Sequence, residues 1–119
     1  MLNIEELSEV SMQIILNAGD ARAIIEEVII SIEKGNFDEA EEKMTEAKKK
    51  ISLAHSSQTK AIQGEAMGEK IPYSVLFAHA QDTLMVVMSE LNTTRRFMKL
   101  FKQYDERLKK LEGENKNEI

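Results

Sequence analysis

Hydrophobic residues recur at spacings of three and four along most of the chain. This period places them on one face of an α-helix. The stripe is interrupted twice, around Gly35 and again between Met67 and Tyr73. The pattern therefore predicts three helices, over about residues 3–34, 37–66 and 74–111.

Local signals at the two interruptions indicate how the helices connect. Gly35 suits the left-handed residue just past a helix end, and Asn36 followed by Glu39 matches a capping box for the next helix. Pro72 cannot sit in a helix interior, and Ser74 is a reasonable N-cap. Because the first connection is short, the first two helices should pack antiparallel. The sequence thus predicts an all-α, up-down-up three-helix bundle.

The middle of the third predicted helix is apolar on all sides of its axis. A helix at the surface of a three-helix bundle needs only one apolar stripe, and a helix that is hydrophobic all round is buried all round. Two other helices cannot enclose the third, so we expect the chain to bury this helix against copies of itself. The residues that surround the axis are Leu84, Met85, Val86, Val87, Met88 and Leu91.

Composition supports this fold and excludes some kinds of site. The 119 residues are 42% hydrophobic and 31% charged, with one Pro and no Trp, which favours long helices in a single domain. We expect that domain over residues 1–112 and a disordered polar tail over residues 113–119. The absence of Cys excludes a disulfide scaffold, a thiolate metal site and a thiol nucleophile.

Charge and hydropathy narrow the expected location and partners. The formal net charge of −5 argues against a nucleic-acid partner, which needs clustered Lys and Arg. The first residues lack the regions of a signal peptide, and no window approaches the length needed to span a bilayer. We therefore expect a cytoplasmic protein that does not insert into the membrane. Basic residues do gather late in the chain, where they suit a helix C-terminus, at Arg95, Arg96, Lys99, Lys102, Arg107, Lys109 and Lys110.

Two polar residues interrupt the apolar start of the third predicted helix. His79 and Asp82 lie about 60° apart around a helix axis, so they share a face. A buried polar group without a partner costs roughly 1–3 kcal/mol, so each residue needs a role. A neutral imidazole can accept a phosphoryl group and pass it on. A structural His–Asp hydrogen bond and a zinc site completed by His55 are alternatives, whereas motifs for other enzyme chemistry, such as a Gly-rich phosphate loop, do not occur.

Four short motifs follow one another along the chain: Asn17-Ala18-Gly19-Asp20-Ala21-Arg22, Ala54-His55-Ser56-Ser57-Gln58-Thr59, Pro72-Tyr73-Ser74-Val75 and His79-Ala80-Gln81-Asp82-Thr83-Leu84-Met85. In this order they resemble the lactose/cellobiose-type enzyme IIA proteins of the bacterial phosphoenolpyruvate-dependent sugar phosphotransferase system. Each motif alone is weak. All four together, on a chain of the right length, make a specific match from about Glu5 to Tyr104.

The resemblance implies a phosphotransferase that acts as a relay. Members of this family are homotrimers of three-helix subunits, and so nine-helix bundles. They take a phosphoryl group from the histidine phosphocarrier protein HPr and pass it to the cognate IIB component, which phosphorylates sugar entering through the membrane component IIC. The phosphorylated histidine of the family corresponds to His79, with the phosphoryl group on Nε2 as a tele-phosphohistidine. The family aspartate that meets its symmetry copies around a divalent metal, usually Mg²⁺, corresponds to Asp82.

The chemistry of three carboxylates agrees with this implied metal site. Like charges at one axis repel strongly, and a hard cation with oxygen ligands removes the repulsion. We therefore expect Asp82 to serve assembly and His79 to serve the chemistry. Many family members carry a second His where this chain has Thr83, and His55 matches a motif position without an assigned catalytic role.

By the same resemblance, the sugar taken up and phosphorylated is a disaccharide of the lactose, cellobiose or chitobiose type. The alternative function is a structural helical oligomer or adaptor, in which His79 and Asp82 are packing details.

Overall fold

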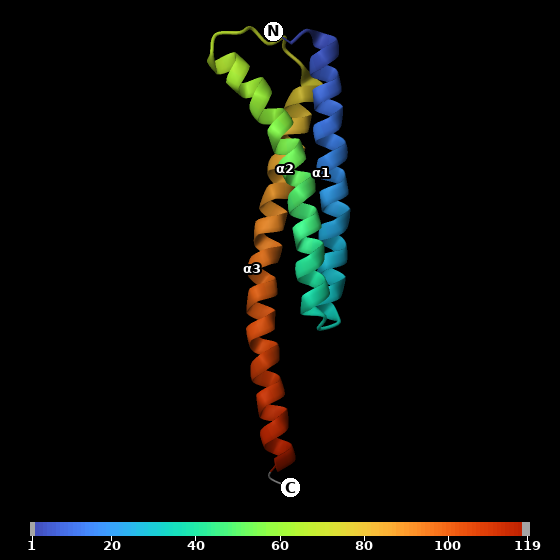
Figure 1. Ribbon diagram of the computed structural model, residues 1–119, viewed down its shortest axis with the longest axis vertical. Helices are drawn as coiled ribbons and strands as arrows, with labels where there is room; N and C mark the ends of the chain where they lie inside the picture. The colour runs from blue at the N-terminus through green and yellow to red at the C-terminus, as the bar shows by residue number, and fades with distance from the viewer. Residues whose placement is uncertain (1, 118–119) are drawn as a thin grey trace.

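The computed structural model describes residues 2–117 and consists of three long helices (Figure 1). α1 spans Ile4–Glu33, α2 spans Phe37–Ala66 and α3 spans Val75–Asn117. The helices alternate in direction and form an elongated molecule of 74 × 22 × 19 Å. The predicted all-α, up-down-up arrangement is confirmed, with α1 and α2 beginning and ending within one residue of the predicted positions.

The turn between α1 and α2 forms where the sequence predicted it. Gly35 has a φ of +73°, and its N–H donates to the Ile32 carbonyl at 2.9 Å. The N–H of Asn36 donates to the Ser31 carbonyl at 2.9 Å, so two carbonyls at the end of α1 are satisfied. The side chain of Asn36 then caps α2, because its Oδ1 accepts from the Glu39 N–H at 3.4 Å and its Nδ2 donates to the Glu39 carboxylate at 2.8 Å.

Small residues on α2 and larger ones on α1 and α3 make up the core. Alanines at a spacing of seven on α2 are fully buried and allow α1 to lie close beside α2, except at the last turns of α2, which lean away (Figure 1). Each fully buried Leu or Val contributes about 1.5–3 kcal/mol relative to an exposed one. The alanines are Ala40, Ala47 and Ala54, and the large residues with no exposed surface are Leu7, Ile14, Val28, Leu84 and Val87.

Only one side of α3 is covered by the rest of the chain. Leu84, Val87 and Leu91 face α1 and α2 and are buried. Met85 and Val86, on the other side, expose 56% and 48% of their surface. Within the single chain, α1 and α2 therefore do not enclose α3, as we expected.

The C-terminal part of α3 reaches well past the turn that joins α1 and α2 (Figure 1). The helix continues to Asn117 instead of ending at Leu111. The disorder expected for the tail stays a prediction. Residues 118 and 119 lie outside the described residues. Gly113 weakens a helix by about 1 kcal/mol relative to Ala, and no Pro follows it to stop the helix. Among the helices described, none is long and apolar enough to cross a membrane.

Candidate functional site

The N-terminal end of α3 positions the first candidate residue, His79. Ser74 caps this end, because its hydroxyl oxygen accepts a hydrogen bond from the Phe77 N–H at 3.0 Å. Ala80 and Leu84 are completely buried and fix the orientation of this part of the helix. His79 then falls in the second turn of α3, with its side chain exposed to solvent.

The imidazole of His79 has no hydrogen-bond or ion-pair partner among the residues that the structure describes. The hydroxyl of Thr83 lies one turn further along, but it donates to the backbone carbonyl of His79 at 2.8 Å. The Thr83 hydroxyl therefore bonds to the backbone of α3 and not to the imidazole, so both ring nitrogens of His79 are available for chemistry.

Asp82 lies on the same exposed face and also has no ion-pair partner among the described residues. Because the carboxylate is exposed within the single chain, it carries none of the desolvation cost that the apolar sequence around it suggested. Over the residues described, no group of three or more His, Asp or Glu side chains comes close enough to hold a metal ion. Asp82 thus contributes a single carboxylate in one chain. Carboxylate oxygens are ligands that Mg²⁺ prefers, but one carboxylate does not make a metal site.

His55 is not part of this arrangement. It lies on the exposed side of α2, and its Nδ1 is 3.4 Å from the hydroxyl oxygen of Thr59 one turn later. The alternative zinc site formed by His55, His79 and Asp82 is ruled out within the chain, because the described residues contain no such metal-binding group.

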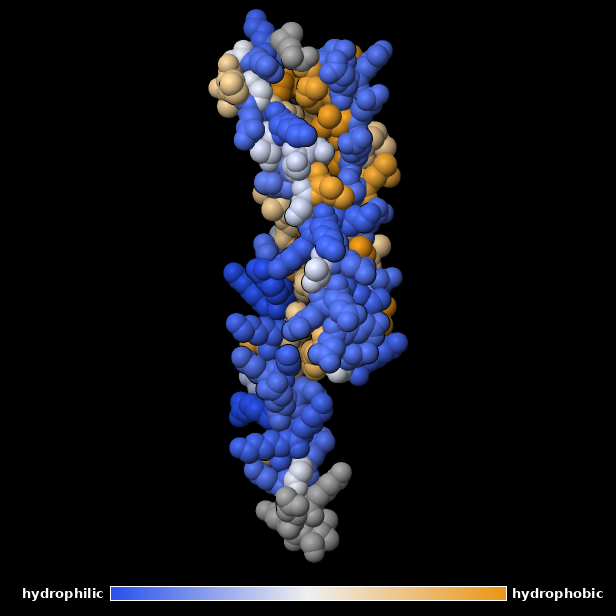
Figure 2. All heavy atoms as spheres, in the orientation of Figure 1, coloured by the Kyte–Doolittle hydropathy of each residue, from blue (hydrophilic) through white to orange (hydrophobic). Residues whose placement is uncertain are grey.

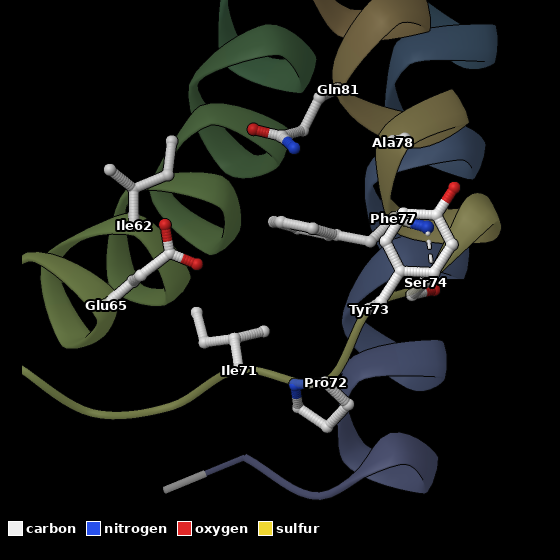
Figure 3. A pocket seen from close by; sticks show the side chains of 9 residues that line it. All are labelled: Ile62, Glu65, Ile71, Pro72, Tyr73, Ser74, Phe77, Ala78 and Gln81. Carbon is white, nitrogen blue, oxygen red and sulfur yellow. Dashed lines mark hydrogen bonds between the residues drawn. The ribbon is translucent and has the colours of Figure 1, made fainter.

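A pocket of about 350 Å³ adjoins this region, between the end of α2 and the start of α3 (Figure 3). It exists because the last turns of α2 lean away from the bundle, and Figure 2 shows hydrophobic residues gathered on this upper part of the surface. Phe77 points from α3 toward Ile62 and Glu65 of α2 (Figure 3). The residues that line the pocket are Ile62, Glu65, Ile71, Pro72, Tyr73, Ser74, Phe77, Ala78 and Gln81.

A polar contact joins α2 and α3 at the edge of the pocket. Nε2 of Gln58 donates to Oε1 of Gln81 at 3.4 Å, and Gln58 is 6% exposed. Gln58 belongs to the second of the four motifs and Gln81 to the fourth, so the contact joins two motifs that the sequence alone leaves separate. His79 itself lies outside the pocket lining and faces open solvent.

An ion pair that was not predicted from the sequence joins α1 to α3, about three helix turns after His79. The guanidinium of Arg22 donates two hydrogen bonds to Glu90, at 2.6 and 3.1 Å. These bonds lower the pKa of the Glu90 carboxyl below its ordinary value and raise the pKa of Arg22. Arg22 belongs to the first of the four motifs, so this part of the resemblance has a structural explanation in the packing of α1 against α3.

Comparisons with known proteins agree on one family. Residues 9–102 match the family model described as PTS system, Lactose/Cellobiose specific IIA subunit. The lactose-specific EIIA component of Lactococcus lactis subsp. lactis is 37% identical over 102 residues, which cover 86% of this chain and 97% of that protein.

Solved structures show the same fold. PtcA from S. mutans superposes with a TM-score of 0.83 and 36% sequence identity, covering 85% of this chain and 99% of that one. IIA(Chitobiose), solved in complex with HPr, superposes with a TM-score of 0.74 and 30% identity, covering 84% of this chain and 97% of that one.

Proposed function

Because this chain belongs to the lactose/cellobiose-specific IIA family of the phosphotransferase system, we propose that His79 is the residue that carries the phosphoryl group. The chain is a phosphocarrier, a relay protein with phosphotransferase activity, in the lactose, cellobiose and chitobiose branch of that system. The observation that carries the proposal is an exposed imidazole in the fourth motif, on a well-capped helix, with no partner within residues 2–117 as far as their side chains are described.

The transfer at His79 is a displacement at phosphorus. The Nε2 lone pair of neutral His79 attacks the phosphorus atom of phosphorylated HPr, and a nitrogen–phosphorus bond forms while the bond to the HPr histidine breaks. The second transfer repeats the step with the IIB component as the acceptor, and neutral His79 is regenerated. A relative solved with HPr, at 30% identity, supports HPr as the donor.

A relay between HPr and the IIB component requires His79 to be exposed. Two different proteins must reach the same Nε2 atom in turn, so the ring has to stay open to solvent between transfers. His79 meets this condition, and Thr83 does not compete for its ring because the threonine hydroxyl bonds to the backbone. We place this relay in the cytoplasm, as the sequence suggested.

The uncovered side of α3 supports a homotrimer. Met85 and Val86 are about half exposed and lie on the side of α3 away from its own core. Three copies that pack these sides together would form the predicted nine-helix bundle, and the apolar area would leave water.

Asp82 would then contribute a metal ligand from each copy. It lies on the same side of α3 as Val86, four residues away, so packing of this side brings three carboxylates together. Mg²⁺ or another divalent cation would neutralise the three charges and hold the copies in register. His79, about 60° further around the helix, would lie toward the opening between copies.

The decisive experiment is phosphorylation in a purified relay. The full chain is incubated with phosphoenolpyruvate, enzyme I and HPr, and the adduct is followed by mass spectrometry and by its loss in acid. We expect one phosphoryl group per chain, absent in His79→Ala and retained in the matched variant His55→Ala. If the unmodified protein acquires no acid-labile adduct, the alternative of a structural oligomer is favoured. If the adduct persists in His79→Ala, another residue carries the phosphoryl group.

A further inference from the structure

A second groove lies between the start of α2 and the lower half of α3, well away from His79. Its volume is about 480 Å³, which is within the range of small-molecule sites in proteins. Lys99, on its wall, lies about 30 Å beyond His79 along α3, at 1.5 Å per residue. Figure 2 shows that the surface of this lower part of the molecule is mostly hydrophilic. This cavity is called the basic groove below.

Three cations form the wall of the basic groove on α3. Arg95, Lys99 and Lys102 follow one another at spacings of four and three, so their side chains share one face of the helix. Nζ of Lys102 forms an ion pair with Oε1 of Glu41 on α2, at 3.8 Å. Over the part of the chain that the structure describes, neither Arg95 nor Lys99 has an ion-pair partner. Two positive charges on one helix face thus repel each other without compensation.

An anion between Arg95 and Lys99 would remove this repulsion. A guanidinium offers five N–H donors in a fixed fork that matches the oxygens of a phosphate group, and an ammonium adds a mobile positive charge. Arg95 uses one of its donors within the described residues, because its Nη2 donates to Oδ1 of Asn92 at 3.3 Å. The remaining donors are available, so the two cations favour a phosphate group as the ligand.

The other polar groups of the lining suit a ligand that also carries hydroxyl groups. Glu41 and Glu106 present carboxylates, and Gln103 presents a carboxamide. Carboxylates repel a bare phosphate but accept hydrogen bonds from hydroxyls, and a carboxamide both donates and accepts. Met98, which is buried, forms an apolar floor. The basic groove therefore combines cations for a phosphate with acceptors for hydroxyl groups, which is the chemistry of a sugar phosphate.

The cations lie off the side of α3 that the proposed trimer would bury. Around the helix axis, Lys99 lies about 100° from Asp82. Arg95 lies about 140° from Asp82, and Lys102 about 160°. The packing of α3 against copies of itself along the side of Asp82 would therefore leave these charges outside that contact.

We propose that the basic groove binds a phosphorylated sugar. The phosphate group lies between Arg95 and Lys99, and the sugar hydroxyls donate to Glu106 and contact Gln103. The choice of a lactose derivative as the probe rests on the function proposed above. Because His79 is about 30 Å away, binding in the groove and phosphoryl transfer can be tested separately.

Titration of the full-length, isotopically labelled chain measures the binding through its amide NMR shifts. The probes are lactose 6-phosphate, lactose and inorganic phosphate, at one pH and one ionic strength. We expect lactose 6-phosphate to bind at least about tenfold more tightly than either of the others, with the shifts confined to the basic groove. Equal affinity for lactose 6-phosphate and inorganic phosphate would mean an anion site only and would overturn the proposal, as would the absence of binding.

Substitution of the cations tests the phosphate contact. In Arg95→Gln with Lys99→Gln, the affinity for lactose 6-phosphate should fall at least about tenfold, because two charge-assisted contacts are lost. The matched variant Lys60→Gln with Lys70→Gln removes the same charge outside the groove lining and should bind as the natural chain does. An equal loss in both variants would mean that net charge governs binding and would refute a site in the groove. Circular dichroism verifies that both variants keep their helices.

Substitution of a carboxylate tests the sugar contact. In Glu106→Ala, we expect the affinity for lactose 6-phosphate to fall several-fold, whereas inorganic phosphate should bind as tightly or more tightly, because a repelling charge is gone. The control Glu112→Ala, outside the groove lining, should change neither affinity. If Glu106→Ala binds both probes more tightly, Glu106 accepts no hydrogen bond from the sugar and the proposed arrangement is wrong.

An anionic membrane surface is the competing ligand for the same cations. Sedimentation with vesicles of phosphatidylglycerol and phosphatidylcholine tests it. We expect the natural chain to bind these vesicles no better than Arg95→Gln with Lys99→Gln does. Vesicle binding that these substitutions abolish, without binding of lactose 6-phosphate, would assign the groove to lipid and exclude the sugar phosphate.

Phosphorylation by HPr separates this inference from the function proposed above. We expect the groove variants to accept a phosphoryl group on His79 as the natural chain does. A natural chain that binds lactose 6-phosphate in the groove but is not phosphorylated would refute the function alone. A phosphorylated chain that does not bind lactose 6-phosphate would refute the sugar-phosphate site alone.

Discussion

Leu84 offers the sharpest test of how the bundle supports the site. It has no exposed surface, and it lies on α3 between His79 and the middle of the helix. Replacing it with Ala removes three carbon atoms from the core. At about 0.8 kcal/mol for each buried methylene equivalent, the lost transfer free energy is about 2.4 kcal/mol. A residual cavity of about 50 Å³ would add about 1.2 kcal/mol, so we expect a loss of about 3–4 kcal/mol.

Urea unfolding at one fixed protein concentration measures this loss, because the stability of an oligomer depends on concentration. The matched control is Met85→Ala, on the same turn of α3 but 56% exposed in the single chain. At high dilution, where the contacts of the proposed trimer would be lost, the destabilisation by Met85→Ala should be smaller than that by Leu84→Ala by at least about 2 kcal/mol. A loss under about 1 kcal/mol in Leu84→Ala would refute the reasoning, because it would mean that Leu84 is not packed in the core.

Three further predictions follow from particular contacts. The lowered pKa of Glu90 means that its bond to Arg22 adds stability at pH values above the ordinary glutamate range, and that this is lost as the pH falls through the folded pKa. Unfolding measured from about pH 3 to 6 should therefore depend less on pH in Glu90→Gln, by a small margin because both side chains are partly exposed. Asn36→Ala should cost about 1 kcal/mol in thermal or urea unfolding, through loss of the cap on Glu39. Asp82→Leu should give a trimer whose sedimentation no longer responds to a chelator, whereas a monomeric product would contradict the assembly role.

The helix boundaries were predictable because their causes are local. Gly35 and Asn36 act through their own backbone and through a neighbour three residues away, and Ser74 does the same for α3. The far end of α3 was mispredicted because the polar sequence after Leu111 was read as a stop. A lone Gly113 weakens a helix without ending it, and the helix continues to Asn117.

The sequence singles out the candidate residues of the site but not their surroundings. His79 and Asp82 stand out in an apolar stretch, but the sequence does not tell which side of α3 its own chain covers. That depends on the placement of α1 and α2, which bury Leu84 and leave Val86 exposed. The bond between Arg22 and Glu90 joins residues 68 positions apart, and a single sequence carries no signal for such a pair.

The free-energy cost of desolvation would therefore differ between His79 and Asp82 only in the proposed trimer. In the single chain both are exposed, so neither is desolvated. In the proposed trimer, packing of three α3 helices along the side that holds Asp82 and Val86 would desolvate the Asp82 carboxylate, which would then need a cation. In the proposed relay, His79 would have to stay open to HPr and IIB. The two side chains are separated by about 4.5 Å along the helix and about 60° around it. The edge of the contact between copies would then fall within that interval. Thr83 lies about 40° beyond His79, on the side away from Asp82. A bulky residue introduced at Thr83 should therefore impair transfer to His79 before it affects assembly.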